Sequence, residues 1–481
     1  MARKRLQGRA HLRAGSAVVS LVSVLLAAGC SMTPAYERPE LPVPAAWPED
    51  VRAGAVATAG PGTAAKPVDW GSFFPDERLR ALIKLSLEHN RDSRMATLRV
   101  AEARALYGVQ RADRLPGVNV GASQTTTRLP ADLSATGNAL ISRRVDVNVS
   151  LLPFELDFWG RVASLSEAAK ALYLATEQAQ RAFRLSLIAT VADAYWAQVE
   201  AQERLDIARV TLQSRDETRQ LVGHRRTAGL AGDLDYLQAE AAYEGAKSDL
   251  LALQRQHAAA RNYLQSLVGN DLSRLPGGKP LAQQAVALDQ QADVPSQVLV
   301  RRPDILAAEQ RLLAANANIG AARAAFFPRI SLTAAAGTAS NQLANLFKDG
   351  QEAWSFSPSL TLPIFDYGRN SANLDLAEVR KDLAVADYER TVQQAFREVA
   401  DLLVARDKLT EQLQAIQAQE RAQQRASDIA QARYQQGLGT FLEVLDAQRQ
   451  LFAVQQNLIQ SRRAIWSSAA QLYKALGGDE G

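Results

Sequence analysis

Four short stretches of the chain alternate between apolar and polar residues with a period of two, the pattern of β-strands that have one apolar face. In the second stretch, for example, Val145, Val147 and Val149 alternate with Asp146 and Asn148. The polar positions of the four stretches are mainly Ser, Thr and Asn. Each stretch is about ten residues long, as are strands that cross a lipid bilayer. The pattern predicts four strands, at about 117–127, 144–154, 329–338 and 354–364.

These strands are interpreted as membrane strands, with the apolar face toward lipid and the polar face toward a water-filled lumen. The alternative is two amphipathic hairpins packed on a soluble core, but no further sheet is predicted that could cover the apolar face. Four strands cannot close a barrel, because the smallest membrane barrels have about eight. Open sheet edges are not tolerated in lipid, so the barrel must be shared between copies, and a trimer would supply twelve strands.

Helical patterns precede and follow each strand pair. A helix is expected from near Asp76 to about Ala112, and its counterpart begins at Pro303. Very long helices follow the strand pairs, at roughly 161–227 and 369–436, each on the order of 100 Å at about 1.5 Å per residue. The chain then returns on helices whose apolar positions recur every seven residues, which is typical of left-handed coiled coils. His257 falls on this seam and is interpreted as a core-facing structural residue.

Both halves of the chain carry the same order of elements. A shift of 208 positions places Gly160-Arg161 on Gly368-Arg369, and it places Gly269 on Gly477. Self-similarity at a fixed spacing indicates an internal duplication. The expected organisation is therefore one architecture in two variants: a mainly α chain with a β membrane part and an internal two-fold repeat.

The first 29 residues have the features of a secretion signal: five basic residues, then an apolar run that ends at Cys30. The run is about a dozen residues long, whereas a membrane-spanning helix needs roughly 20. The small residues before Cys30 resemble the lipobox of bacterial lipoproteins, although Ala27 stands where that motif more often has Leu. We expect Cys30 to be acylated, for example with palmitate, and Ser31 after it favours transfer to the outer membrane. The alternative is a buried free thiol behind an ordinary signal peptide.

Composition argues against nucleic-acid binding and against catalysis. Without the five basic residues of the signal, 50 of the 55 Lys and Arg remain against 51 Asp and Glu, so the mature chain is close to neutral. Nucleic-acid binding needs a concentrated basic face, and none is expected here. The four histidines are scattered, and no metal-ligand spacing, nucleophile elbow or phosphate loop is present. We therefore expect no enzyme activity, no cofactor and no metal site.

Several junction motifs together resemble the TolC-like outer-membrane factors of the lipoprotein (NodT) type, which serve bacterial tripartite efflux pumps. The motifs are the lipobox, Arg301-Arg302-Pro303-Asp304, Leu362-Pro363-Ile364-Phe365-Asp366-Tyr367-Gly368-Arg369, Arg433-Tyr434-Gln435-Gln436-Gly437 and Glu443-Val444-Leu445-Asp446-Ala447-Gln448. The resemblance implies a homotrimer in which a twelve-stranded outer-membrane β-barrel continues into a long periplasmic α-helical barrel.

The resemblance also implies a function and partners. The chain would be the exit duct of a tripartite efflux pump, lipid-anchored in the bacterial outer membrane and extending into the periplasm. It would assemble with itself, with outer-membrane lipid, with a periplasmic adaptor (membrane fusion) protein and with an inner-membrane pump that selects the cargo. The alternative is a non-channel coiled-coil lipoprotein that serves as a periplasmic scaffold or spacer.

The expected organisation then has five parts: a signal peptide, a lipidated arm and linker, a first structural repeat, an equatorial connector and a second repeat. These parts are placed at 1–29, 30–75, 76–277, 278–300 and 301–481.

By the same resemblance, the helix tips are where transport would be controlled. Leu442 and Asp446 lie four residues apart and thus on one helix face, and they are expected to form an apolar ring and an acidic ring at the channel constriction. Tyr434 and Glu443 are expected to make polar contacts that hold the gate shut; the alternative is that the carboxylates of Glu443 and Asp446 lie on a solvated helix end. The expected adaptor-docking positions at the two tips are Asp233, Leu234, Gly437 and Gly439.

Overall fold

The computed structural model describes residues 31–44, 47, 69–135, 137–273, 275–286 and 296–479. The predicted signal peptide (1–29) and the predicted lipid-attachment residue Cys30 lie outside the described residues, as does part of the predicted connector. The chain divides into two compact units. The strand unit comprises Met1–Pro39, Val100–Thr176 and Ala308–Tyr388, and the hairpin unit comprises Glu40–Arg99, Glu177–Ala307 and Glu389–Gly481.

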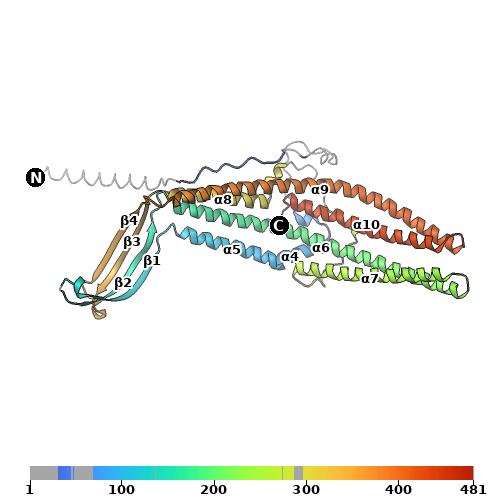
Figure 1. The fold of residues 1–481 in the computed structure, drawn as a ribbon, viewed down its shortest axis with the longest axis horizontal. Helices are drawn as coiled ribbons and strands as arrows, with labels where there is room; N and C mark the ends of the chain where they lie inside the picture. The colour runs from blue at the N-terminus through green and yellow to red at the C-terminus, as the bar shows by residue number, and fades with distance from the viewer. Residues whose placement is uncertain are drawn as a thin grey trace. The chain divides into compact units, whose positions relative to one another are not determined.

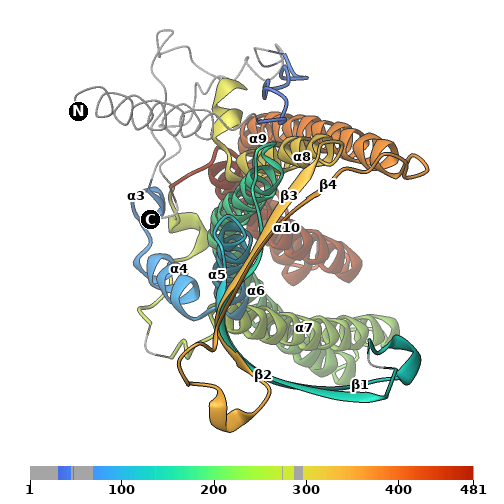
Figure 2. The ribbon, with the colours of Figure 1, turned by 90° about the vertical axis from the view of Figure 1, so that its left-hand side faces the viewer.

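The strand unit contains one four-stranded antiparallel sheet with the order β1-β2-β3-β4, so the edge strands among those described are β1 and β4. The four strands lie side by side as one curved sheet (Figures 1 and 2). Short 3-10 helices lie in the two hairpin connections, at Ala131–Leu133 and Leu343–Asn345. The strands are β1 (Val118–Leu129), β2 (Leu140–Glu155), β3 (Arg329–Ser340) and β4 (Glu352–Thr361).

The strand register places the apolar positions of all four strands on one face. Val120 pairs with Val149, Val149 with Ala336, and Ala336 with Trp354, so one row crosses the whole sheet. Val120 and Trp354, at the two ends of the row, are 78 % and 81 % exposed, so the described chain leaves both ends uncovered. The predicted period-two alternation is confirmed. An apolar face this open needs lipid or another copy against it, since soluble proteins rarely expose large apolar patches.

The opposite face of the sheet is small and polar. The hydroxyl oxygens of Ser331 and Ser359 lie 2.7 Å apart across β3 and β4. The strands approach so closely at Gly337 that a Cβ there would lie 2.1 Å from the carbonyl oxygen of Val147. A glycine is therefore required at this crossing, because any side chain would push two neighbouring strands apart.

Helices make up most of the rest of the described chain, and α5, α6, α8 and α9 each have residues in both units. No described helix combines the length and the apolar composition that crossing a bilayer would require. Short 3-10 helices lie at Leu281–Gln283 and Ser296–Arg301. The α-helices are α3 (Trp70–Phe73), α4 (Glu77–His89), α5 (Arg91–Ala112), α6 (Arg161–Thr227), α7 (Asp233–Val268), α8 (Pro303–Ala324), α9 (Arg369–Gln435) and α10 (Phe441–Ala475).

The expectation of one helix from near Asp76 to about Ala112 was wrong, because the chain breaks between α4 and α5. Asn90 has an extended backbone (φ −61°, ψ 131°). Its side-chain oxygen accepts the N–H of Ser93 at 2.8 Å, and its amide nitrogen donates to the carbonyl of Leu267 at 2.8 Å. Asn90 therefore caps the start of α5 and ties the break to α7, a role that suits asparagine at a helix N-cap.

The hairpin unit has an aromatic core where α3, α4, α6 and α10 meet. Phe73, Phe74, Trp196 and Tyr473 are fully buried there, with ring centroids 4.8–6.1 Å apart. Along α10 the predicted seven-residue seam is buried at Val444, Leu458 and Leu472. On α7 the same seam includes His257, which is half-buried, and burial lowers the pKa of its imidazole. The predicted seven-residue seam is thus buried or half-buried on both returning helices.

The Arg301-Arg302-Pro303-Asp304 motif begins α8, with Pro303 at the first helical position as predicted. Arg302 is buried and donates to the Asp304 and Glu398 carboxylates, each at 2.8 Å, and to the carbonyl oxygen of Ala475 at 2.8 Å. Although burial alone would raise the pKa of Glu398, Arg302 and then Lys474 hold it below its usual value. The motif thus ties the start of α8 to the middle of α9 and to the end of α10 within the hairpin unit.

Candidate functional site

The two helical hairpins, α6–α7 and α9–α10, end in tips of the same design. Gly437 has a left-handed backbone (φ 75°); its N–H donates to the Tyr434 carbonyl at 3.0 Å, and the next N–H, of Leu438, donates to the Arg433 carbonyl at 2.8 Å. This is the Schellman arrangement that ends helices at glycine. The same pair of bonds surrounds Gly229 (φ 71°) at the first tip.

The tips differ in how the returning helix begins. At the second tip, the hydroxyl oxygen of Thr440 accepts the N–H of Glu443 at 3.3 Å and caps α10. A Cβ at Gly439 would lie 3.0 Å from a Glu443 carboxylate oxygen, so the carboxylate turns back over the tip. Glu443, a predicted gate contact, therefore takes part through its N–H in capping its own helix, and Thr440 and Glu443 have the spacing of a capping box. Gly232 begins α7 without a side-chain cap.

The predicted constriction residues lie on the exposed face of the first two turns of α10. Leu442 is 61 % exposed, whereas Phe441 and Val444 on the other side of the helix are buried. Asp446 is half-exposed and accepts from Arg449 and Gln450, each at 2.6 Å. Each copy of the carboxylate therefore has a cation on its own helix, so three assembled copies would carry a ring of ion pairs rather than bare carboxylates.

Tyr434, the other predicted gate contact, makes aromatic and cation–π contacts that join the two hairpins. Its ring lies 5.4 Å from that of Phe441, and the guanidinium of Arg225 on α6 lies over it at 5.2 Å. Phe441 packs with the buried Val222 of α6 and Ala239 of α7. The start of α10 is thus held against both helices of the other hairpin, and such contacts contribute about 0.5–2 kcal/mol each.

At the first tip, Asp233 and Leu234 are predicted to dock an adaptor, and Asp233 already makes an ion pair within the tip. Asp233 pairs with Arg226 at 2.6 Å, and the guanidinium of Arg226 lies 4.9 Å from the ring centroid of Tyr236. The side chain of Leu234 is exposed, as is that of Leu438 at the second tip. Exposed leucines on two neighbouring tips offer apolar contact area to a partner.

An open groove of about 330 Å³ lies among α6, α7 and α10, and both Leu442 and Asp446 line it. Arg215 of α6, which also lines the groove, is only 8 % exposed and donates to the side-chain oxygen of Gln448 at 2.6 Å. Burial lowers the pKa of Arg215. One charge-assisted hydrogen bond therefore ties α10 to α6 near Leu442 and Asp446.

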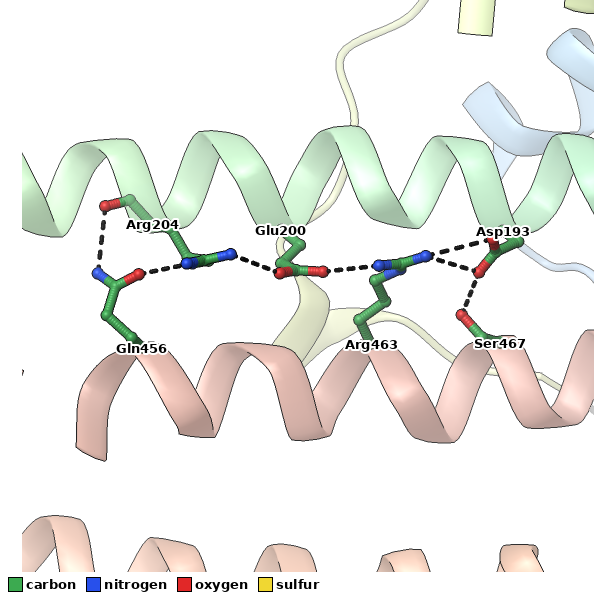
Figure 3. A network of polar contacts seen from close by, with 6 residues as sticks. All are labelled: Asp193, Glu200, Arg204, Gln456, Arg463 and Ser467. Carbon is green, nitrogen blue, oxygen red and sulfur yellow. Dashed lines mark hydrogen bonds and ion pairs between the residues drawn. The ribbon is translucent and has the colours of Figure 1, made fainter. Parts of the chain in front are cut away.

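Further along the same helix pair, a row of six polar residues, which we call the α6–α10 ladder, fastens the two helices (Figure 3). Arg463 is its centre and donates to Glu200 at 3.1 Å and to Asp193 at 3.2 Å. Although burial alone would lower the pKa of Arg463, these two carboxylates raise it above its usual value. The row comprises Asp193, Glu200 and Arg204 of α6 and Gln456, Arg463 and Ser467 of α10.

Polar contacts between α10 and α6 are unevenly distributed along the two helices. The ladder begins at Gln456, and Asp446 lies ten residues before it, about 15 Å along the helix. Between them the polar attachment in the described structure is the bond from Arg215 to Gln448. The part of α10 that carries Leu442 and Asp446 therefore has fewer polar contacts to α6 than the part that carries Arg463.

Sequence reasoning did not identify Arg215, Arg449 or the ladder. Arg449 could have been found, since a cation three residues after an acid pairs with it on a helix. The ladder joins residues about 260 positions apart, and no local pattern reveals such a register. Among the described residues, no group of His, Cys, Asp and Glu side chains could hold a metal ion.

A sheet with a bare apolar face, together with long paired helices that end in exposed tips, defines an outer-membrane channel protein. The Outer membrane efflux protein family model matches residues 82–270 and 294–478, and the chain belongs to this family.

Relatives and solved structures of the family match almost the whole chain. It is 45 % identical to outer membrane protein OprJ of Pseudomonas aeruginosa over 471 residues, covering 96 % of each chain. It is also 45 % identical to the toluene efflux pump outer membrane protein TtgF of Pseudomonas putida, again covering 96 % of each. The open state of the Neisseria gonorrhoeae MtrE outer membrane channel superposes with a TM-score of 0.83 at 37 % identity, covering 93 % of this chain and 98 % of that one.

The architecture and function expected from the resemblance are confirmed by these findings. The chain is one subunit of a trimeric outer-membrane channel, to which it supplies four of twelve barrel strands, and the barrel continues into an α-helical barrel. It is the outer-membrane component of an efflux pump and extends into the periplasm. The family is one of transport channels.

Proposed function

We propose that this chain forms a passive exit duct, without catalytic activity, whose aperture is set by Leu442 and Asp446. The observation that carries the proposal is the one-sided burial of the start of α10. Phe441 and Val444 anchor the helix, while Leu442 and Asp446 face away from the packed core. Three copies would bring these side chains together as an apolar ring above or below a polar one, and a narrow apolar ring resists wetting.

Docking of a periplasmic adaptor at the hairpin tips would control this aperture. Two observations support such a docking surface. Leu234 is exposed at the tip of the first hairpin, and Gly437 and Gly439 shape the turn at the tip of the second. Asp233, held by Arg226, would present a fixed carboxylate beside them. An inner-membrane pump would complete the assembly and select the cargo.

Anchoring and cargo complete the proposal. Cys30 would carry the acyl chain that attaches each subunit to the outer membrane. Relatives at 43–45 % identity are named for toluene, solvent and antibiotic efflux. Small apolar and amphipathic organic compounds are therefore the cargo class to test first.

Single-channel conductance in planar bilayers tests the aperture assignment. Leu442→Ala and Asp446→Ala should each raise the conductance, because the first widens the apolar ring and the second removes the carboxylate and its ion pair. Leu251→Ala on α7 and Asp382→Ala on α9, which change exposed residues of the same types, are the matched controls and should leave the conductance unchanged. Unchanged conductance in both aperture variants would remove Leu442 and Asp446 from the constriction.

A further inference from the structure

A short extended segment after the predicted lipid-attachment residue, Thr33–Arg38, lies in a fitted site on the strand unit. We call this segment the arm. Its first contact is at Thr33, whose hydroxyl oxygen lies 3.1 Å from that of Ser164 at the start of α6. A Cβ at Gly320 of α8 would lie 2.2 Å from the same Thr33 oxygen. Glycine at position 320 is thus what lets the arm lie directly on the helix.

The arm continues along α8 in the opposite direction to the helix. The amide nitrogen of Asn316 donates to the carbonyl oxygen of Pro34 at 2.8 Å. Thr33 contacts α8 at Gly320 and Arg38 contacts it at Glu309, eleven residues earlier, a separation of about 17 Å along a helix. Five residues of fully extended chain span at most about 18 Å. The arm therefore runs along α8 and is fixed to it near both of its ends.

The far end of the arm is held by a clasp at Glu309. This residue is 7 % exposed, and its two carboxylate oxygens accept from Arg38 Nε at 2.7 Å and Arg38 Nη2 at 2.5 Å. The Tyr36 hydroxyl donates to the same carboxylate at 3.2 Å. Burial, and then Glu309, raise the pKa of Tyr36 to about 12. A bidentate arginine–carboxylate pair with a third donor is a strong and geometrically specific contact.

The N-terminal end of the arm lies near the end of β2 and the start of α6. Ser31 lines a groove of about 540 Å³ together with Phe154 of β2, Leu156, Phe158 and Ser164 of α6. The strand ends mark the border between the membrane part and the periplasmic part of the family architecture. An acyl chain on the preceding residue would begin one residue from this border.

We propose that the clasp of Tyr36 and Arg38 on Glu309 is a positioning device for the lipid anchor, which it holds at the border between the sheet and the helices so that acyl chains enter the bilayer beside the barrel. The inference rests on the proposed acylation of Cys30. The clasp acts through the arm. By fixing the arm on α8, it limits the positions that the acylated residue can take and so favours the orientation in which the barrel inserts into the membrane.

Charge exchange in the full-length protein, expressed in a Gram-negative host, tests this role. Arg38→Glu and Glu309→Arg each place like charges together, and the double variant Arg38→Glu with Glu309→Arg restores an opposite pair. Glu378→Gln, which breaks the more exposed ion pair of Glu378 with Arg323 in the same unit, is the control. Two quantities are measured: cleavage of the arm after Tyr36 by chymotrypsin, whose sites these substitutions do not change, and the fraction of dodecyl sulfate-resistant trimer in the outer membrane.

Each single variant should speed cleavage about tenfold, since an unsatisfied buried partner shifts such an equilibrium by one to two decades, and it should lower the trimer fraction severalfold. The double variant should recover both readouts, and the control should match the unchanged protein. Faster cleavage with an unchanged trimer fraction would overturn the positioning role, and unchanged cleavage would overturn the clasp. The mass of the N-terminal peptide reports acylation separately, so an unacylated Cys30 would refute the anchor rather than the clasp.

Discussion

Replacing Arg463 by methionine removes the centre of the α6–α10 ladder while keeping a side chain of similar length. The substitution breaks the contacts to Glu200 at 3.1 Å and to Asp193 at 3.2 Å (Figure 3). Glu200 is buried but keeps Arg204 as a partner, and Asp193 is about one-third exposed. Breaking a fully buried ion pair costs about 3–5 kcal/mol, whereas an exposed pair contributes about 0–1 kcal/mol. Because the contacts of Arg463 are of intermediate burial, the substitution should lower the free energy of unfolding by about 2 kcal/mol.

Scanning fluorimetry of the purified trimer in detergent measures this loss. At roughly 2 °C per kcal/mol for a chain of this size, Tm should fall by about 4 °C. Asp193→Asn and the double variant Asp193→Asn with Arg463→Met complete a double-mutant cycle. The two single effects should sum to more than the double effect, because both remove the same contact. Arg255→Met, which removes an exposed arginine of α7, should change Tm by less than 1 °C. Equal shifts for Arg463→Met and Arg255→Met, or strictly additive effects, would refute the ladder.

Two further predictions concern the start of α8 and the sheet. Glu398→Gln should lower Tm at pH 7, because Arg302 and then Lys474 hold the pKa of Glu398 below its ordinary value of 4.5. This stability is present above pH 4.5 and is lost as the pH falls through the lowered pKa, so the Tm difference between the variant and the unchanged protein should shrink at pH 3.5. Glu411→Gln, which changes an exposed glutamate, is the control and should change Tm little at pH 7. Gly337→Ala should cost about 1–3 kcal/mol and reduce the dodecyl sulfate-resistant trimer, because the new Cβ would meet the Val147 carbonyl. Gly121→Ala, whose Cβ would lie 3.7 Å from the nearest atom, should have little effect, and equal trimer fractions would contradict the close strand crossing.

Periodic features of this chain could be predicted from its sequence because each is set locally. The four strands follow from alternation at positions such as Val145, Val147 and Val149, and the sheet register confirms a single apolar face. The ends of α6 and α9 follow from Gly229 and Gly437, whose left-handed backbones only glycine adopts at little cost. Local sequence and tertiary structure agree at these points.

The break at Asn90 and the contacts of α10 could not be predicted in the same way. Asn90 reads as an ordinary polar residue in a helical pattern, and its capping role depends on the carbonyl of Leu267, which a distant segment supplies. Arg215 and Arg463 look like surface arginines of amphipathic helices, but packing buries Arg215 and half-buries Arg463. Side chains that act across such long separations, 177 positions for Asn90 and Leu267, need the three-dimensional register, which one sequence does not contain.

The boundaries proposed for the parts of the chain, 76–277 and 301–481 for the two repeats with 278–300 between them, remain a prediction. The compact units follow a different division, since each unit takes residues from both repeats. Duplication in sequence and compactness in space therefore describe different properties of this chain. Circular permutation at the connector would test whether each repeat folds as a unit.

The mass and conductance of the purified mature protein test the central claim most directly. Native mass spectrometry from detergent should give three copies per particle, and the same preparation should form ion-conducting channels in planar bilayers. A barrel of twelve strands requires three chains that each supply the β1–β4 sheet. A monomer that stays dissolved without detergent and conducts no ions would contradict the account.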